Sequence, residues 1–190
     1  AENEVEGYVE TYPEYAKFCD PGNRVKMYFV ARLNKEPEQV GIFYDSLLKA
    51  DSTFTRGVGN GLYLLFSTYE NELVEMQVGL SYTSLENARR NLDAESEGQN
   101  FDQVHREATL KWNEMLGRIR VESSRQQDLI KFYTGLYHAL LGRGLANDVN
   151  GQYVRNDGGT GQIPLDQKGN PKYRHFNTDG IWGGFWNLGQ

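Results

Sequence analysis

The stretch Val78-Gly-Leu-Ser-Tyr-Thr-Ser-Leu-Glu-Asn-Ala-Arg89 marks the point at which the chain changes from a strand pattern to a helix pattern. Up to Thr83, apolar and polar residues alternate with a period near two, which is typical of a β-strand with one buried face. After it, apolar residues recur at the spacing of one helix face over Leu85–Ala94, and Ser84 is placed to cap that helix. The sequence therefore predicts a β half followed by a helical half.

The residues before this switch contain several short apolar runs. Residues 24–34 and 71–83 alternate apolar and polar side chains, and residues 39–44 and 62–68 form shorter runs. Pro, Gly and Asn residues that favour turns separate the runs, and no helical period lies between them. This arrangement is typical of an antiparallel sheet or β-sandwich. About five strands are too few for a complete sandwich of roughly seven, so we expect strand partners outside this chain.

The residues after the switch predict two further helices. Asn100 is placed to cap the first, with Gln103 at the position that completes a capping box. The second is predicted over Leu129–Leu141, where apolar residues follow the i, i+3, i+4, i+7 spacing. Its apolar stripe is wide, so we expect this helix to be buried against other helices. The fold class is therefore α+β, an antiparallel β-sandwich portion followed by helices.

Residues 146–172 show no period and predict a long connection, with a short hairpin around residues 152–156 and 162–168. Two segments of it are rich in side-chain oxygens, Asn147-Asp-Val-Asn-Gly151 and Asn156-Asp-Gly-Gly159. Oxygen ligands suit Ca²⁺, but neither segment has the Glu at position twelve of a helix–loop–helix calcium site. Asn and Asp also favour turns for backbone reasons, and the turn interpretation is preferred.

The composition argues against several classes of protein. The net charge is −6 and no block of Lys or Arg is present, which argues against general nucleic-acid binding. The single cysteine, Cys19, allows no intrachain disulfide. No segment approaches the roughly 18–20 apolar residues of a membrane span. The N-terminal residues lack the pattern of an export signal, so a signal would have been removed or would lie upstream of Ala1.

Two histidines on the predicted helices are weak candidates for chemistry. His138 falls off the apolar stripe of its helix and is interpreted as a residue of the helix surface or boundary. His105 has no acidic or histidine residue at i+4, which argues against a metal pair.

The C-terminal run His175–Gln190 gathers aromatic and polar side chains around glycines. Trp182, Phe185 and Trp186 fall at i, i+3 and i+4, and Asp179 is placed to cap a helix there. So much aromatic surface has to be covered by a core, a partner or a ligand. Aromatic faces beside Asp, Asn and His suit a sugar, whose C–H face stacks on a ring while its hydroxyls need donors and acceptors. The residues alone leave open a truncated core helix and the wall of a ligand site.

Several motifs occur together and in order along the chain. The longest is His175-Phe-Asn-Thr-Asp-Gly-Ile-Trp-Gly-Gly-Phe-Trp-Asn-Leu188, and the others are Val25–Ala31, Val78–Arg89, Trp112–Glu114, Phe132–Leu140 and Asp148–Gly151. These motifs resemble those of the calcium-dependent α-mannosidases of glycoside hydrolase family 92. The resemblance covers nearly the whole chain.

The resemblance implies a parent protein with a β-sandwich, a helical linker and an (α/α)6 barrel. Residues 1–83 would be the C-terminal part of the sandwich, residues 84–122 the linker helices, and residues 123–190 the start of the catalytic barrel. It also implies exo-hydrolysis of α-mannosides in mannose-rich glycans with inversion, by one carboxyl that acts as the acid and one carboxylate that activates water. Calcium would help to distort the sugar and position that water.

The same resemblance places the catalytic carboxyl groups and most calcium ligands of the family beyond Gln190. It therefore assigns no catalytic residue and no metal ligand to this chain, and the chain alone is expected to be inactive. The part that it assigns here is a sugar-binding wall, with the substrate-binding candidates His175, Asn177, Asp179, Trp182 and Gly183.

Gly183 departs from the family pattern. Many members have Trp-Asp where this chain has Trp182-Gly183, and that Asp contacts the mannose. Its loss puts the usual hydroxyl contacts in question and predicts a different preference at or beyond the terminal mannose. Asp179 is a candidate to compensate.

The expected partners are mannose-containing glycans, and the expected location of the parent is the periplasm or outside the cell. Two alternatives stay open. The first is a non-catalytic carbohydrate-binding β-sandwich module, and the second is a structural segment between domains.

Overall fold

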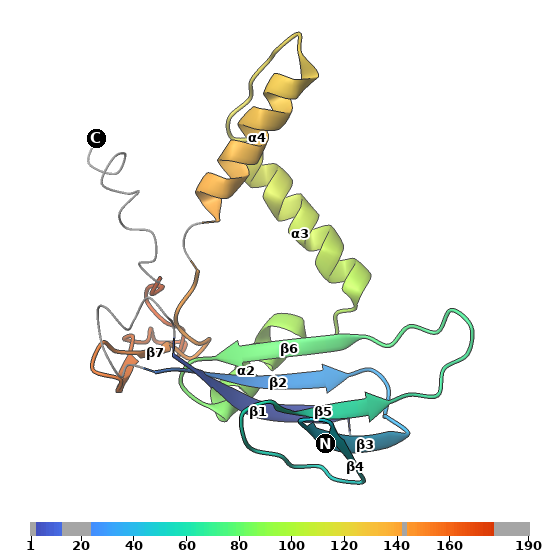
Figure 1. Ribbon diagram of the computed structural model, residues 1–190. Coiled ribbons are helices and arrows are strands. Elements are labelled where there is room, and N and C mark those ends of the chain that lie inside the picture. The colour runs from blue at the N-terminus through green and yellow to red at the C-terminus, as the bar shows by residue number, and fades with distance from the viewer. Residues whose placement is uncertain (1–2, 13–23, 142–143, 177–190) are drawn as a thin grey trace.

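The computed structural model describes residues 3–12, 24–141 and 144–176. In chain order its elements are β1 (Glu4–Thr11), β2 (Val25–Leu33), β3 (Gln39–Tyr44), β4 (Leu47–Ala50), β5 (Asn60–Leu65), β6 (Met76–Ser81), α2 (Leu85–Ser96), α3 (Phe101–Leu116), α4 (Gln126–Leu140), β7 (Gln152–Val154) and β8 (Thr160–Gln162) (Figure 1). Strands precede the three long helices, so the predicted α+β class is confirmed.

The first sheet, called sheet A, has the antiparallel order β1-β2-β6, and its central strand β2 is buried on both sides. Val30 is fully buried and packs against Ala88 and Leu92 of α2. Ala31 and Leu33 point to the opposite face, because side chains alternate along a strand, and they are buried as well. β2 is therefore covered by α2 on one side and by other parts of the chain on the other.

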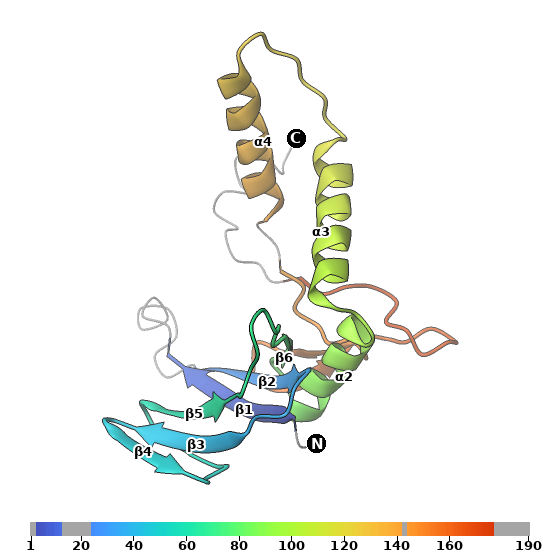
Figure 2. The ribbon, with the colours of Figure 1, turned by 90° about the vertical axis from the view of Figure 1, so that its right-hand side faces the viewer.

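The second sheet, called sheet B, has the antiparallel order β4-β3-β5. Its central strand β3 has one buried apolar side chain, Ile42. Helix α2 covers one side of sheet A, and sheet B lies toward the other (Figures 1 and 2). The two sheets form the β-sandwich portion that the sequence predicted.

The strand predictions agree with β2, β3 and β5 to within a few residues, whereas residues 71–83 give a shorter strand. β6 begins only at Met76, because the backbone turns before it: the N–H of Glu72 donates to the carbonyl of Tyr69 at 3.1 Å, and Asn71 has a φ of 65°. β1 and β4 were not predicted.

Helix α2 begins where the sequence changes its period. The Ser84 hydroxyl accepts a hydrogen bond from the Asn87 N–H at 3.1 Å, as expected of an N-cap. The helix approaches β6 closely at Gly79, where an added Cβ would lie 2.6 Å from the Cβ of Leu92. Only glycine leaves room for the helix at this distance from the strand.

Helices α3 and α4 form a hairpin that extends away from the sheets in both views (Figures 1 and 2). The predicted capping box of α3 is present, with Asn100 and Gln103 each bonding to the other's backbone. Trp112 of α3 meets Tyr137 of α4 with their ring centroids 4.5 Å apart. The prediction that α4 is buried was wrong for the described residues, since none of its side chains is buried. The reason is that, among the described elements, only α3 packs against its wide apolar stripe.

An ion-pair network around the buried Glu4 carboxylate joins β1, β2 and α2. The Glu4 carboxylate is 8% exposed and accepts hydrogen bonds from Arg32 at 2.8 Å and from Arg89. Arg32 also reaches Asp93 at 2.8 Å, and Arg89 reaches Glu6 at 2.6 Å. Burial acts to raise the pKa of Glu4, but the two guanidinium groups outweigh burial and hold this pKa below its usual value.

The lowered pKa of Glu4 predicts a loss of stability in acid. A carboxyl whose pKa is lower in the folded state stabilises the fold above its unfolded pKa, about 4.3, and loses this contribution as the pH falls through the folded pKa. Glu4→Gln should therefore lower the free energy of unfolding at pH 7 and make its decline below about pH 4 less steep. Urea unfolding between pH 3 and 7 measures this. Glu86→Gln, at an exposed pair within α2, is the control, and equal pH profiles of the two variants would contradict the prediction.

Candidate functional site

Four of the five predicted substrate-binding residues, Asn177, Asp179, Trp182 and Gly183, lie outside the described residues. The fifth, His175, lies within them. The described part of the candidate site is therefore His175 and what surrounds it.

The backbone of His175 is held by the segment that follows α4. The Ala146 N–H donates to the His175 carbonyl at 2.8 Å, and the His175 N–H donates to the Asn147 side-chain oxygen at 2.7 Å. Leu145 and Phe176 pair as an antiparallel bridge beside these contacts. The backbone of His175 is thus fixed by Ala146 and Asn147.

The His175 ring lies against Tyr153 of the β7–β8 hairpin. The ring centroids are 4.7 Å apart and the ring planes are inclined by 38°. The two rings border an open hollow of about 460 Å³, whose other lining residues are Val154, Arg155, Asn156 and Asp157. An aromatic wall with a polar rim is therefore the form of the described site.

The second strand of the hairpin that carries Tyr153 lies earlier in the sequence than predicted. β7 begins at Gln152 as expected, but β8 spans Thr160–Gln162 and ends where the second strand was predicted to begin. The turn is tighter than expected because Asp157 closes it: its carboxylate accepts the Gly159 N–H at 2.9 Å and the Arg155 guanidinium at 2.8 Å. These two contacts lower the pKa of Asp157.

A polar cluster around the buried Asp148 carboxylate holds the segment that precedes Tyr153 and contacts His175. The Asp148 carboxylate is 4% exposed and accepts hydrogen bonds from the Thr83 hydroxyl at 2.5 Å, from the Asn87 amide at 3.0 Å and from the Asn91 amide at 2.8 Å. Thr83 stands just before α2, and the two asparagines lie one turn apart on it. The segment that holds His175 is therefore fastened to the first two turns of α2.

The same asparagines also bind the backbone and side chains around Asp148. Asn91 accepts the Val149 N–H at 2.9 Å, and Asn87 accepts the Asn150 amide at 2.8 Å. A turn closes here through the Gly151 N–H, which donates to the Asp148 carbonyl at 2.8 Å. These contacts confirm the turn interpretation of residues 147–151. The described residues contain no cluster of His, Cys, Asp or Glu that could hold a metal ion.

The two helix histidines take no part in this arrangement. His138 on α4 and His105 on α3 are both exposed. Each ring lies beside an aromatic ring of its own helix. The ring centroids of His138 and Tyr137 are 5.8 Å apart, and those of His105 and Phe101 are 6.0 Å apart. The surface interpretation of His138 is confirmed.

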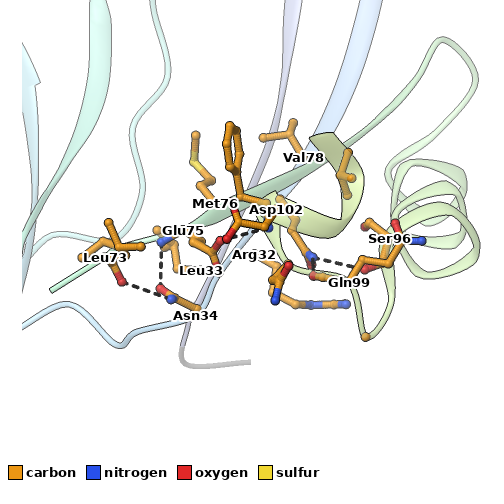
Figure 3. A pocket seen from close by; sticks show the side chains of 16 residues that line it. Arg32, Leu33, Asn34, Leu73, Glu75, Met76, Val78, Ser96, Gln99 and Asp102 are labelled. Atoms are coloured by element: carbon orange, nitrogen blue, oxygen red, sulfur yellow. Dashed lines mark hydrogen bonds between the residues drawn. The ribbon is translucent and has the colours of Figure 1, made fainter. Parts of the chain in front are cut away.

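A larger cleft of about 710 Å³ lies between the edge of sheet A and the turn from α2 to α3 (Figure 3). Several of its polar groups are paired with one another or with the backbone. Glu75 accepts the Phe101 N–H at the start of α3 at 3.0 Å, and its own N–H donates to Asn34 at 2.9 Å. Gln77 donates to the carbonyls of Ser96 and Gln99 at 3.1 and 2.6 Å. These bonds fix the direction in which α3 leaves the sandwich, so the cleft has a structural role.

Sequence reasoning missed Tyr153, Asp148, Asn87 and Asn91. A signal for the asparagines was present, because polar residues at i and i+4 stand directly beside the apolar pair Ala88 and Leu92. That spacing places two amides on one flank of a helix whose adjacent flank is buried.

Within the described ranges, no helix is long and apolar enough to cross a membrane.

Comparison with known proteins gives one family match and several similar structures. The family described as the glycosyl hydrolase family 92 catalytic domain matches residues 87–190, more than half of the chain. None of the curated proteins matches the chain significantly.

Among solved structures, a family GH92 α-mannosidase from Bacteroides thetaiotaomicron is 20% identical, with a TM-score of 0.76, and the match covers 97% of this chain and 24% of that one. An inverting mannosidase of the same family and organism is 22% identical, with a TM-score of 0.81 and the same coverage. The GH92 glycosyl hydrolase ccman5 is 25% identical, with a TM-score of 0.77, over 94% of this chain and 22% of that one. The chain thus spans about a quarter of the length of these proteins and shares the fold of that quarter.

Proposed function

The chain belongs to glycosyl hydrolase family 92, and from this membership we propose that it is part of a longer glycosidase that removes terminal mannose from α-mannosides. The observation that carries the proposal is the family match over residues 87–190, which includes the whole candidate site. The similar solved structures are described as α-mannosidases, one of them also solved in complex with mannoimidazole. The proposed partners are therefore mannose-containing glycans.

The role proposed for this chain is to bind and orient the sugar. A sugar ring stacks its C–H face on an aromatic side chain, and its hydroxyls pair with neighbouring polar groups. His175 and Tyr153 supply the rings, and the polar rim of the hollow supplies donors and acceptors. Asn177, Asp179, Trp182 and Gly183 remain the proposed continuation of this wall.

The chemistry proposed for the whole protein is hydrolysis with inversion, which needs an acid and a base carboxyl about 6.5–9.5 Å apart. We propose that these groups, like the calcium ligands, belong to other parts of the longer protein. The described residues contain no group of three or more His, Cys, Asp or Glu side chains that could hold a metal ion, and both oxygens of the buried Asp148 accept hydrogen bonds from hydroxyl and amide donors. Export to the periplasm or the cell exterior is proposed because its glycan substrates are expected there.

The proposal predicts different results for the longer protein and for the 190-residue chain. With calcium, the longer protein should release mannose from α-mannobiose, and proton NMR should show the β-anomer of mannose first, as inversion requires. Removal of calcium with a chelator should abolish release, and calcium should restore it. The 190-residue chain should release no mannose under any of these conditions.

Three outcomes would decide against parts of this proposal. Turnover by the 190-residue chain would show that its catalytic groups lie within it. Binding of mannosides by the longer protein without hydrolysis would favour the carbohydrate-binding module. Neither binding nor hydrolysis by the longer protein would leave the structural segment as the remaining interpretation.

A further inference from the structure

We propose that Asp148 is a positioning residue: it fixes the loop of residues 145–153, called the anchor loop, and through this loop it sets the place of His175. The inference rests on the proposed function, in which His175 contacts the sugar, and adds to it a residue that touches no sugar itself. Asp148 is 4% exposed, which is too little for direct contact with a ligand. Its effect on binding therefore passes through the residues around it.

The carboxylate of Asp148 is a buried charge whose described hydrogen-bond donors are all neutral. One hydroxyl and two amides donate to its two oxygens. Burying a carboxylate that is held by neutral donors alone is costly, and neutral or apolar groups often serve stability equally well. The cost points to a role of Asp148 beyond stability.

The anchor loop carries the position of Asp148 to His175 through its backbone. The side chain of Asn147 accepts the His175 N–H at 2.7 Å and donates to the Asp148 carbonyl at 2.9 Å. The Ala146 N–H donates to the His175 carbonyl at 2.8 Å. Two consecutive residues thus hold both backbone polar groups of His175, and the next residue along the chain is the one anchored to α2.

The other end of the anchor loop fixes the ring that lies against His175. The Asp148 N–H donates to the Gln152 carbonyl at 2.8 Å, and the Gln152 side chain accepts the Asn87 amide at 2.5 Å. Tyr153 follows directly, and its ring centroid lies 4.7 Å from that of His175. Both rings are therefore held by residues that contact Asp148 or its partner Asn87 on α2.

The alternative is that Asp148 contributes to stability alone, and the two roles differ in what a folded variant does. A role in stability predicts that every folded molecule of a variant acts as the wild type does. A positioning role predicts that the folded variant binds sugar more weakly, because a displacement of about 1 Å is enough to cost about 100-fold in rate. Kinetic constants measured well below the unfolding temperature separate the two roles.

The test uses Asp148→Asn in the longer protein, assayed with an aryl α-mannoside at a temperature at which the variant is fully folded. Asparagine keeps one acceptor oxygen, so this variant loses less of the cluster than Asp148→Ala. KM should rise about three- to tenfold with kcat nearly unchanged, since losing a contact made equally in the ground state and the transition state raises KM alone. Asp148→Ala, assayed where it is folded, should raise KM further.

Glu4→Gln is the matched control. Glu4 is also a buried carboxylate that binds α2, through Arg89, and its side chain is 8% exposed. Its described partners belong to β1, β2 and α2, and none of them lies in the anchor loop. Glu4→Gln should therefore lower stability while it keeps the KM and kcat of the wild type.

A second measurement needs no activity. In the 190-residue chain, NMR should show a nuclear Overhauser effect between the ring protons of Tyr153 and His175. This effect should weaken in Asp148→Asn and persist in Glu4→Gln. An unchanged ring contact in Asp148→Asn, or a KM equal to that of Glu4→Gln, would overturn the inference. A wild-type longer protein that neither binds nor hydrolyses mannosides would contradict the proposed function, and the inference would fall with it.

Discussion

Replacing Gly79 with alanine is expected to destabilise the chain by about 3 kcal/mol or more. Gly79 lies on β6 opposite Val30, directly beneath α2. Its new Cβ would collide with the Ala88 carbonyl and lie 2.6 Å from the Cβ and 2.9 Å from the N of Leu92. Two of these three atoms belong to the backbone of α2, so no rotation of a side chain relieves the overlap. The helix would have to move off the sheet and expose Val30.

Gly135→Ala is the matched control for this substitution. Gly135 lies inside α4 with no atom within 4 Å of the added Cβ. The same chemical change should there stabilise the helix by up to about 1 kcal/mol, because alanine is the better helix former. Urea unfolding followed by circular dichroism measures both variants. A Gly79→Ala variant as stable as the wild type would show that α2 does not approach the sheet as described.

Replacing Asp148 with alanine is the second change with a large expected effect. It would take one acceptor from the Thr83 hydroxyl and from the amides of Asn87 and Asn91. The Asn87 amide keeps Gln152 and the Asn91 amide keeps the Leu80 carbonyl as acceptors. An unsatisfied buried donor costs about 1–3 kcal/mol, so a loss of about 2–4 kcal/mol is expected if water does not enter. Chemical denaturation and hydrogen exchange should show the loss, with the Val149 amide among the first to exchange faster.

The controls for Asp148 separate charge from shape. Asp148→Asn keeps one acceptor oxygen but turns an amide toward other donors, so it should lie between the wild type and Asp148→Ala. Asp157→Asn changes an exposed aspartate of the same segment, whose surface ion pair contributes little. Equal stability of Asp148→Ala and Asp157→Asn would show that the Asp148 cluster does not hold the segment to α2.

The sequence predicted best those elements whose local rules agree with the tertiary structure. β2 was predicted because apolar side chains recur at every second position along it. The helix starts at Ser84 and Asn100 were predicted because capping depends on neighbouring residues alone. β1 was missed because Gly7 interrupts its alternation of valine and glutamate. In the fold that glycine leaves room for Phe29, whose ring would lie 3.0 Å from an added Cβ.

The remaining features depend on contacts between distant parts of the chain. The short, non-alternating strand β4 forms because it pairs with β3. The Asp148 cluster joins residues about sixty positions apart, and no spacing rule foresees such a contact. The burial predicted for α4 depended on how many helices surround it, which its own periodicity does not determine. Of the candidate site, the sequence pointed to His175 but not to its partner Tyr153, since a single tyrosine in a polar connection carries no pattern.

The two flanks of α2 have a consequence for the order of folding. Its apolar flank, Ala88 and Leu92, meets β2, which precedes it in the chain. The amides of its other flank donate to Asp148, which lies 61 positions after Asn87 and follows the whole α3–α4 hairpin in the chain. During synthesis the helix can dock on sheet A first, while its asparagines remain hydrated, because closing the later loop carries an entropic cost. Attachment of the segment that holds His175 to α2 is thus expected to be a late step, which follows the emergence of the hairpin.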